Sequence, residues 1–118
     1  MQDINEILAY LTDSVDGAQI ALIGDFDGLL IEQYPPDGKD LSEVTVQWTK
    51  IITVIDMAAK ALKGGRLQEI MITSERMMAY ARVLNESLFS LIIMNSSGNF
   101  GQAKLYSKKI DKHILEIF

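Results

Sequence analysis

The chain has 118 residues, which is enough for one domain and too few for two ordinary ones. Its hydrophobic content of 48% suits a globular core, and its charged content of 23% argues against disorder. The chain contains no cysteine, which excludes a disulfide framework, a thiolate nucleophile and a cysteine metal site. A net charge of −5 disfavours nucleic acid as the partner. We predict a single domain over residues 1–118.

The first segment, Ile4–Val15, repeats apolar residues at the three- and four-residue spacing of one helical face. Asp3 is the predicted N-cap, with Glu6 at the capping-box position. The start of the chain is acidic and amphipathic rather than basic and then apolar, so we expect no secretory signal. Together with the lack of cysteine, this start favours a cytoplasmic protein.

A β-hairpin is predicted next. Its strands are Ala18–Ile23 and Leu29–Tyr34, and the turn between them ends in Asp27-Gly28, which tolerates positive φ. The spacing of Asp25, Asp27 and Gly28 also resembles the start of a calcium-binding loop. The third oxygen ligand and the closing acidic residue of such a loop are missing, so a plain turn is favoured.

The stretch Leu41–Lys63 is predicted to form one long helix of about 33 Å. Asp40 is the expected N-cap, and the pair Gly64 and Gly65 is expected to end the helix. One broad apolar stripe should bury this helix against its own sheet. The stripe consists of Leu41, Val44, Trp48, Ile51, Ile52, Ile55, Ala58, Ala59 and Leu62.

A second apolar stripe lies nearly opposite the first on the helical wheel. It consists of Val46, Val54, Met57 and Ala61, with the stem of Lys50 between them. One sheet buries one stripe, so the second stripe favours a second copy of the chain over an internal helix. Charged residues interrupt the stretch and argue against a membrane span. The remaining strip is polar and comprises Ser42, Thr45, Thr49, Thr53, Asp56 and Lys60.

Three strand-like runs follow, at Leu67–Ser74, Met77–Leu84 and Leu88–Met94, and their short connectors predict an antiparallel meander. The last run is almost continuously apolar and should lie in the centre of the sheet, whereas the first is mixed and suits an edge. The chain closes with a helix over Phe100–Phe118, capped by Asn99 with Gln102 at the box position. The order predicts an α/β (α+β) fold, a three-layer α/β/α sandwich with five mainly antiparallel strands.

No group of residues forms a recognisable catalytic or metal site, and we expect no cofactor. The single histidine, His113, is expected to be solvated or at the border of an apolar stripe. The segment from Gly98 to Gly101 resembles an anion-binding helix start, but it lacks the Lys-Ser/Thr of a P-loop, so helix capping is favoured. The lysines of the last helix favour a solvated face over a phosphate or acidic partner. They are Lys104, Lys108, Lys109 and Lys112.

Three stretches resemble the Roadblock family, which includes dynein light chain Roadblock and the bacterial gliding-motility regulator MglB. Residues 21–30 resemble the first hairpin of the family, and residues 64–72 resemble its junction from long helix to third strand. Residues 99–104 resemble the Asn-Leu-Gly-like start of its last helix, with Phe100 in place of the commoner leucine. The resemblance covers nearly the whole chain.

The resemblance implies a homodimer in which the long helices pack antiparallel and the third strands pair edge to edge. It adds Gln68, Ile70 and Ile72 to the interface residues of the second stripe. It also implies a small Ras-like GTPase as partner, whose own switch residues the dimer would hold in place without supplying an arginine finger. The polar strips of the two long helices would then flank a platform for that partner.

Two alternatives stay open. The chain is also consistent with a non-catalytic adaptor that binds another Roadblock protein or a response-regulator-type partner. A small-ligand sensor on a similar sandwich would need a sizeable pocket with polar groups to orient the ligand. An enzyme is the least favoured class.

Overall fold

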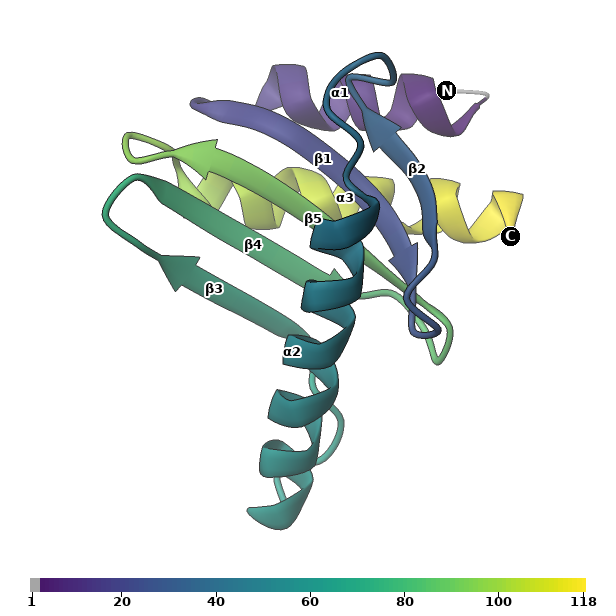
Figure 1. Ribbon diagram of the computed structural model, residues 1–118, viewed down its shortest axis with the longest axis vertical. Helices are drawn as coiled ribbons and strands as arrows, with labels where there is room; N and C mark the ends of the chain where they lie inside the picture. The colour runs from purple at the N-terminus through teal and green to yellow at the C-terminus, as the bar shows by residue number, and fades with distance from the viewer. Residues whose placement is uncertain (1–2) are drawn as a thin grey trace.

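The computed structural model describes residues 3–118, and the first two residues of the predicted domain lie outside that range. Over the described residues, three helices and five strands follow one another in the predicted order. They are α1 (Ile4–Ser14), β1 (Ala18–Asp25), β2 (Leu30–Tyr34), α2 (Ser42–Ala61), β3 (Glu69–Thr73), β4 (Met77–Val83), β5 (Leu88–Asn95) and α3 (Phe100–Ile117). Helix α2 crosses one face of the sheet, and α1 and α3 cover the other (Figure 1). The three-layer prediction is confirmed.

The sheet has the strand order β2-β1-β5-β4-β3, and every neighbouring pair is antiparallel. Strand β5 lies in the centre, where Ile92 stands opposite Ala21 of β1 and Tyr80 of β4. Strand β3 pairs with β4 on one side and forms an edge of the sheet. The continuously apolar run is therefore central and the mixed run is at the edge, as the composition of each strand predicts.

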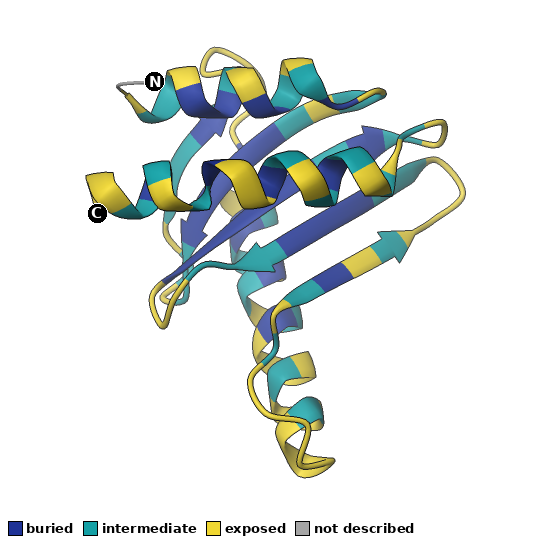
Figure 2. Cartoon of the chain, turned by 180° about the vertical axis from the view of Figure 1, so that it is seen from behind, coloured by how far each residue is buried: buried dark blue, intermediate teal, exposed yellow. Residues whose placement is uncertain are grey.

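Two apolar cores lie on the two faces of the sheet (Figure 2). On one face, α1 and α3 bury their stripes, and Leu8 and Ile110 are fully inaccessible. On the other, Trp48 and Ile52 of α2 pack against Phe89 and its neighbours in the sheet. Each such side chain stabilises the fold by roughly 1.5–3 kcal/mol when it leaves water.

The N-caps of α1 and α3 follow the prediction. Asp3 Oδ1 accepts a hydrogen bond from the Glu6 N–H at 2.8 Å, and Asn99 Oδ1 accepts one from the Gln102 N–H at 3.0 Å. The Gln102 side chain serves another purpose, because its Oε1 accepts the Asp16 N–H at 2.8 Å. This bond ties the start of α3 to the end of α1.

The predicted N-cap of α2 is wrong by one residue. Leu41 occupies the cap position, and Asp40 precedes it. Asp40 Oδ1 accepts the Ser42 N–H at 3.0 Å and the Ser42 hydroxyl at 2.7 Å. Leu41 is 4% exposed and its N–H donates to Gln33 Oε1 at 2.9 Å, so burial of an apolar side chain sets where this helix begins.

The C-terminal end of α2 lies where the glycine pair predicts it, with a shift in which residue turns the chain. Lys63 has a φ of 58°, so a lysine adopts the left-handed conformation that glycine usually supplies. The Gly64 N–H then donates to the Ala59 carbonyl at 2.8 Å and closes the last turn.

Candidate interaction surface

The two faces of the sheet are covered unequally. Helices α1 and α3 share one face, whereas α2 alone lies on the other (Figures 1 and 2). Five strands span roughly 20 Å, and a helix with its side chains is about 10–12 Å wide, so one helix covers about half of its face. Apolar side chains on this face are accordingly only half-buried, namely Ile51 of α2 itself and Ile72, Met77 and Ile93 of the sheet.

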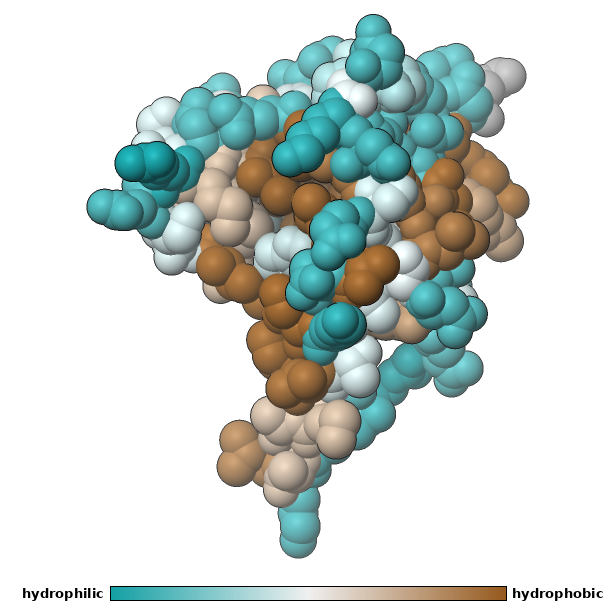
Figure 3. Space-filling view, in the orientation of Figure 1, coloured by the Kyte–Doolittle hydropathy of each residue, from teal (hydrophilic) through white to brown (hydrophobic). Residues whose placement is uncertain are grey.

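Helix α2 also extends beyond the sheet (Figure 1). Its 20 residues span about 30 Å, whereas strands of five to eight residues span roughly 17–26 Å. Val54, Met57 and Leu62 are 64%, 65% and 85% exposed. We define the apolar end of α2 as the exposed residues Val54, Ile55, Met57, Ala58, Ala61 and Leu62. Figure 3 shows that apolar surface runs from the uncovered sheet onto this part of the helix.

The prediction that the whole broad stripe is buried is wrong at its C-terminal end. Ile55, Ala58 and Leu62 belong to that stripe and are exposed, because the sheet ends before the helix does. Of the predicted dimer residues, exposed ones are Lys50, Val54, Met57, Ala61 and Gln68. Val46 and Ile72 are half-buried, and Ile70 on edge strand β3 is buried on the α2 side.

The polar strip of α2 does not form one exposed platform, so the predicted placement of all six residues on one free surface is wrong. Thr45 is fully buried and donates to the Leu41 carbonyl at 2.9 Å. Thr49 is half-buried and donates to the Asp25 carbonyl at 3.1 Å, which joins α2 to the end of β1. Thr45 and Thr49 therefore face the body of the protein. Exposed positions are Ser42, Thr53 and Lys60.

Asp56, the fifth member of the strip, holds the connector after α2 in place. Its Oδ1 accepts the Leu67 N–H at 2.9 Å, and its Oδ2 lies 2.9 Å from Lys60 Nζ. The bond from Leu67, with help from Lys60, lowers the pKa of the Asp56 carboxyl. Asp56 is thus ionised and already paired.

A cavity of about 420 Å³ opens beside the C-terminal half of α2. Its floor is apolar and consists of Phe26, Ile52, Leu67 and Val83. Its rim is polar and consists of Thr53, Asp56, Lys60, Arg66, Asn85 and Glu86. The rim comes from α2, the connector that follows it and the β4–β5 turn, so the fold brings the end of α2 together with a turn that is distant in the sequence.

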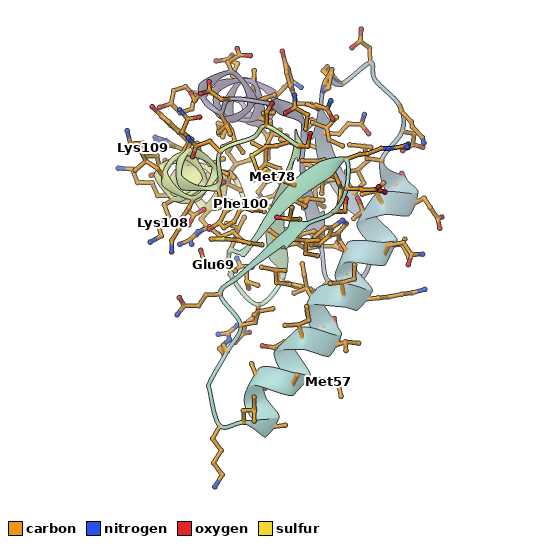
Figure 4. All side chains as sticks on the ribbon, turned by 90° about the vertical axis from the view of Figure 1, so that its left-hand side faces the viewer. Met57, Glu69, Met78, Phe100, Lys108 and Lys109 are labelled. Atoms are coloured by element: carbon orange, nitrogen blue, oxygen red, sulfur yellow. The ribbon has the colours of Figure 1, made fainter. Side chains whose placement is uncertain are left out.

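A cluster of charged side chains links edge strand β3 to α3. Glu69 lies on the side of β3 that faces α3 (Figure 4), and its carboxylate accepts the Tyr80 hydroxyl at 2.6 Å. Lys104 Nζ of α3 lies 2.9 Å from the same carboxylate. Arg82 of β4 pairs with Asp111 of α3 at 2.6 Å. We call these five residues the β3–α3 clasp.

The clasp shifts the pKa of its members in opposite directions. The Tyr80 hydroxyl, with Lys104 and Arg82 nearby, holds the pKa of the Glu69 carboxyl below its usual range. Burial, together with the Glu69 carboxylate, raises the pKa of the Tyr80 hydroxyl. Burial also raises the pKa of Asp111, against the opposing effect of Arg82. At neutral pH, Glu69 is ionised and Tyr80 is protonated.

The other charged and polar candidates have ordinary roles. Lys104 belongs to the clasp, whereas Lys109 Nζ lies 5.0 Å above the Tyr106 ring. Asp25 uses its carboxylate to accept the Asp27 and Leu29 N–H groups within the turn. Within residues 3–118, no three or more histidine, aspartate or glutamate side chains converge as a metal site would require. None of the described helices combines the length and apolarity needed to cross a membrane.

Comparison with known proteins decides the family. The family model of the Roadblock/LC7 domain matches residues 4–89. The chain belongs to the Roadblock/LC7 domain family. No curated protein matched the sequence.

Solved structures with the Roadblock/LC7 fold superpose on the chain despite low identity. MglB of Myxococcus xanthus has 17% identity and a TM-score of 0.86, with 98% of this chain and 94% of that chain covered. A structure described as MglB with a tetrameric arrangement has 22% identity and a TM-score of 0.84, over 95% and 85%. The gliding protein MglB of Thermus thermophilus has 23% identity and a TM-score of 0.79, over 90% and 81%. The shared fold is therefore clear.

Sequence reasoning missed the cavity of this Roadblock/LC7 domain and the exposure of Ile55, Ala58 and Leu62 at the end of α2. The exposure at the end of α2 can be predicted from the sequence, because the predicted helix is longer than any predicted strand. The cavity cannot be predicted from the sequence, because its floor depends on how Phe26, Leu67 and Val83 meet in space.

Proposed function

We propose that the chain is a non-enzymatic, cytoplasmic homodimer that regulates a small Ras-like GTPase, as an activating protein or a scaffold. Membership of the Roadblock/LC7 family supports this proposal. The observation that carries it is the apolar end of α2 beside a half-covered sheet face. Exposed apolar surface of this extent marks an interaction site in a soluble domain.

A second copy of the chain suits this surface. The uncovered half of the α2 face has room for one more helix, and an antiparallel α2 of a second copy would supply it. Val54, Ile55 and Leu62 would then be covered by the partner helix or the partner sheet. The edge of β3 adds unpaired backbone groups that a second β3 can pair with.

The proposed dimer acts on its GTPase by positioning. Phosphoryl transfer depends mainly on orientation and electrostatic stabilisation of groups that the GTPase itself supplies. A dimer with two-fold symmetry presents a surface across its axis once, so one asymmetric GTPase occupies it and excludes a second. This account needs no catalytic residue from the chain.

The test is GTP hydrolysis by candidate small GTPases from the same genome, with and without the protein. We expect faster hydrolysis or nucleotide-dependent binding with at least one of them. The Val54→Asp variant, designed as a monomer, serves as the matched control and should lose the effect. Binding to no GTPase in any nucleotide state would reject the proposal.

A second candidate function is an adaptor that assembles with other Roadblock proteins. A similar structure described as a tetrameric arrangement of MglB supports assembly beyond a dimer for this type of domain. The two candidates differ in nucleotide dependence. Binding to a Roadblock partner that is unaffected by GTP or GDP, without any GTPase effect, would favour the adaptor.

A further inference from the structure

We infer that the cavity beside the C-terminal half of α2 is a docking site for an acidic segment of a partner protein. One large apolar side chain of that segment enters the cavity, and a neighbouring carboxylate pairs with Arg66. The inference rests on the proposed function in assuming a protein partner, and it does not require that partner to be a GTPase.

The floor of the cavity is apolar and held in place. The Phe26 ring packs against Phe89 with a centroid distance of 5.4 Å, and the Phe26 N–H donates to the Ser87 carbonyl at 3.0 Å. Ile52 is 2% exposed and belongs to the core beneath α2. The volume of about 420 Å³ lies within the range of ligand pockets, so a leucine or phenylalanine side chain fits without rearrangement.

Arg66 is the rim residue whose charged group is available to bind an anion. Asp56 is already paired with the Leu67 N–H and Lys60, so it needs no further partner. The Arg66 guanidinium lies 4.0 Å from Glu86, and their side chains are 62% and 86% exposed. This contact is long and solvated, and such pairs stabilise a protein little. A partner carboxylate can replace Glu86 and pair with the guanidinium through two hydrogen bonds.

The segment beside the cavity is more basic than the chain as a whole, which favours an acidic partner. The chain carries a net charge of −5, yet the segment from Val44 to Gln68 contains four basic residues and one acidic residue. The rim carries Lys60 and Arg66 together with Asp56 and Glu86, and Lys63 follows the end of α2. Lys60 is paired with Asp56 at 2.9 Å, so Arg66 and Lys63 remain against the single exposed carboxylate of Glu86. An acidic segment that also carries a large apolar side chain therefore suits this end of the molecule, where basic side chains and an apolar floor lie together.

The proposed second copy of the chain leaves the cavity open. Thr53 and Lys60 line the cavity, whereas Ile55 and Leu62 point nearly the opposite way on a helix with 100° per residue. A helix that covers Ile55 and Leu62 therefore does not cover the cavity. A small molecule is less suited, because five of the six rim residues are exposed and would leave it largely in water.

The experiment is an NMR titration of the intact, isotope-labelled protein with the peptide acetyl-Glu-Phe-Glu-Glu-amide. We expect amide shifts confined to Phe26, Leu67, Val83 and their neighbours. The peptides acetyl-Gln-Phe-Gln-Gln-amide and acetyl-Glu-Ala-Glu-Glu-amide test the charge and the apolar side chain separately. Each should bind at least tenfold more weakly.

Two variants and one control complete the test. Arg66→Glu should weaken binding at least tenfold, and Thr53→Phe should fill the cavity and abolish the shifts. Lys108→Glu makes the same charge change on exposed α3 and should leave binding unchanged. Equal binding of the glutamine peptide, or shifts on Ile55 and Leu62 instead, would overturn the inference. So would binding only by a monomeric variant, because a second copy would then be the occupant.

These outcomes are separate from those of the proposed function. A protein that stimulates a GTPase but ignores the peptides refutes the docking site alone. A protein that binds the peptides at the cavity but affects no GTPase refutes the proposed function alone.

Discussion

Arg82 on β4 and Asp111 on α3 form the closest ion pair of the β3–α3 clasp, with 2.6 Å between Nε and Oδ2. Both side chains are about four-fifths buried, at 20% and 21% exposure. Asp111 Oδ1 is buried and accepts no hydrogen bond from residues 3–118. The carboxylate therefore depends on Arg82 for its compensation, and removing the arginine leaves a desolvated charge behind.

Arg82→Met should destabilise the protein by about 2–3 kcal/mol, because Asp111 is left without its partner. The double variant Arg82→Met, Asp111→Leu should recover at least half of that loss, since it removes both charges and keeps apolar volume. Chemical denaturation of the wild type and the two single and one double variants measures this coupling. Additive effects of the two substitutions would mean that the pair contributes no coupling energy.

Glu69 should make the stability depend on pH in the acidic range. Its pKa in the folded protein lies below the ordinary value of 4.5, so its contribution is fully present above pH 4.5. That contribution is lost as the pH falls through the lowered pKa. Asp111 acts in the opposite direction, because its raised pKa makes the folded state easier to protonate.

The variant Glu69→Gln isolates the contribution of the Glu69 carboxylate to the stability of the fold. We expect it to cost about 1–2 kcal/mol at pH 7 and to flatten the pH dependence of the unfolding free energy below pH 4.5. The matched control is Glu86→Gln, whose carboxylate is on an exposed turn and makes one long contact. A Glu69→Gln variant with the wild-type pH profile would show that Tyr80 and Lys104 do not stabilise the ionised form.

The clasp and the sheet order show how far sequence reasoning reaches. The centre and the edge of the sheet follow from composition, because an apolar strand such as β5 has to be covered on both faces. The caps at Asp3 and Asn99 follow from local hydrogen bonding. The clasp could not be foreseen, because Glu69, Tyr80 and Lys104 meet only after β3, β4 and α3 are packed.

The candidate surface was only partly predictable for a related physical reason. A helical wheel gives the direction of each side chain but not what lies in that direction. Thr45 is polar and yet fully buried, since its hydroxyl donates to Leu41 within the helix. Leu62 is apolar and yet 85% exposed, because the helix extends beyond the edge of the sheet. The periodicity of apolar residues predicts the helix, but the length of the helix relative to the strands determines which of its side chains are exposed.

Gly24→Ala should be strongly destabilising, because β1 and α2 approach closely at this residue. A Cβ at Gly24 would lie 2.7 Å from Phe89 Cζ and 2.7 Å from Thr45 Cγ2. To avoid this steric clash, α2 or the Phe89 ring has to move, which costs about 1–3 kcal/mol in a packed core. Thermal denaturation measures the loss. Gly101→Ala, on the exposed first turn of α3, is the control, because a Cβ there meets only the Asn99 side chain, at 3.2 Å, and this variant should change the melting temperature much less. Equal melting of both variants would show that the contact relaxes freely.

Val54→Asp should abolish dimerisation and leave the monomer folded. Val54 is 64% exposed in the single chain, so a carboxylate there is solvated in the monomer and desolvated in the proposed dimer. Sedimentation should show the wild type as a dimer at micromolar concentration and the variant at the monomer mass of 13.2 kDa. Leu105→Asp makes the same kind of change at a 51% exposed leucine on α3 and should leave the dimer intact. A wild type that remains monomeric at these concentrations would remove the basis of the proposed function.

Thr53→Arg is expected to weaken binding of the GTPase partner about tenfold or more while sparing the dimer. Thr53 is exposed on the cavity side of α2, away from Ile55 and Leu62, so a long charged side chain there obstructs the partner without entering the dimer contact. Its hydroxyl donates to the Thr49 carbonyl within the helix, and losing that bond costs little.

Thr49→Arg is the instructive comparison. Its hydroxyl donates to the Asp25 carbonyl at 3.1 Å, so this variant should also lose roughly 1 kcal/mol of stability, which denaturation will reveal. Binding is measured with the nucleotide-loaded GTPase at a protein concentration where sedimentation shows the dimer. The contradicting outcome is a Thr53→Arg variant that stays a dimer and binds the GTPase with unchanged affinity. The partner then contacts another surface, and the basic outer face of α3 or the free edge of β3 becomes the next to test.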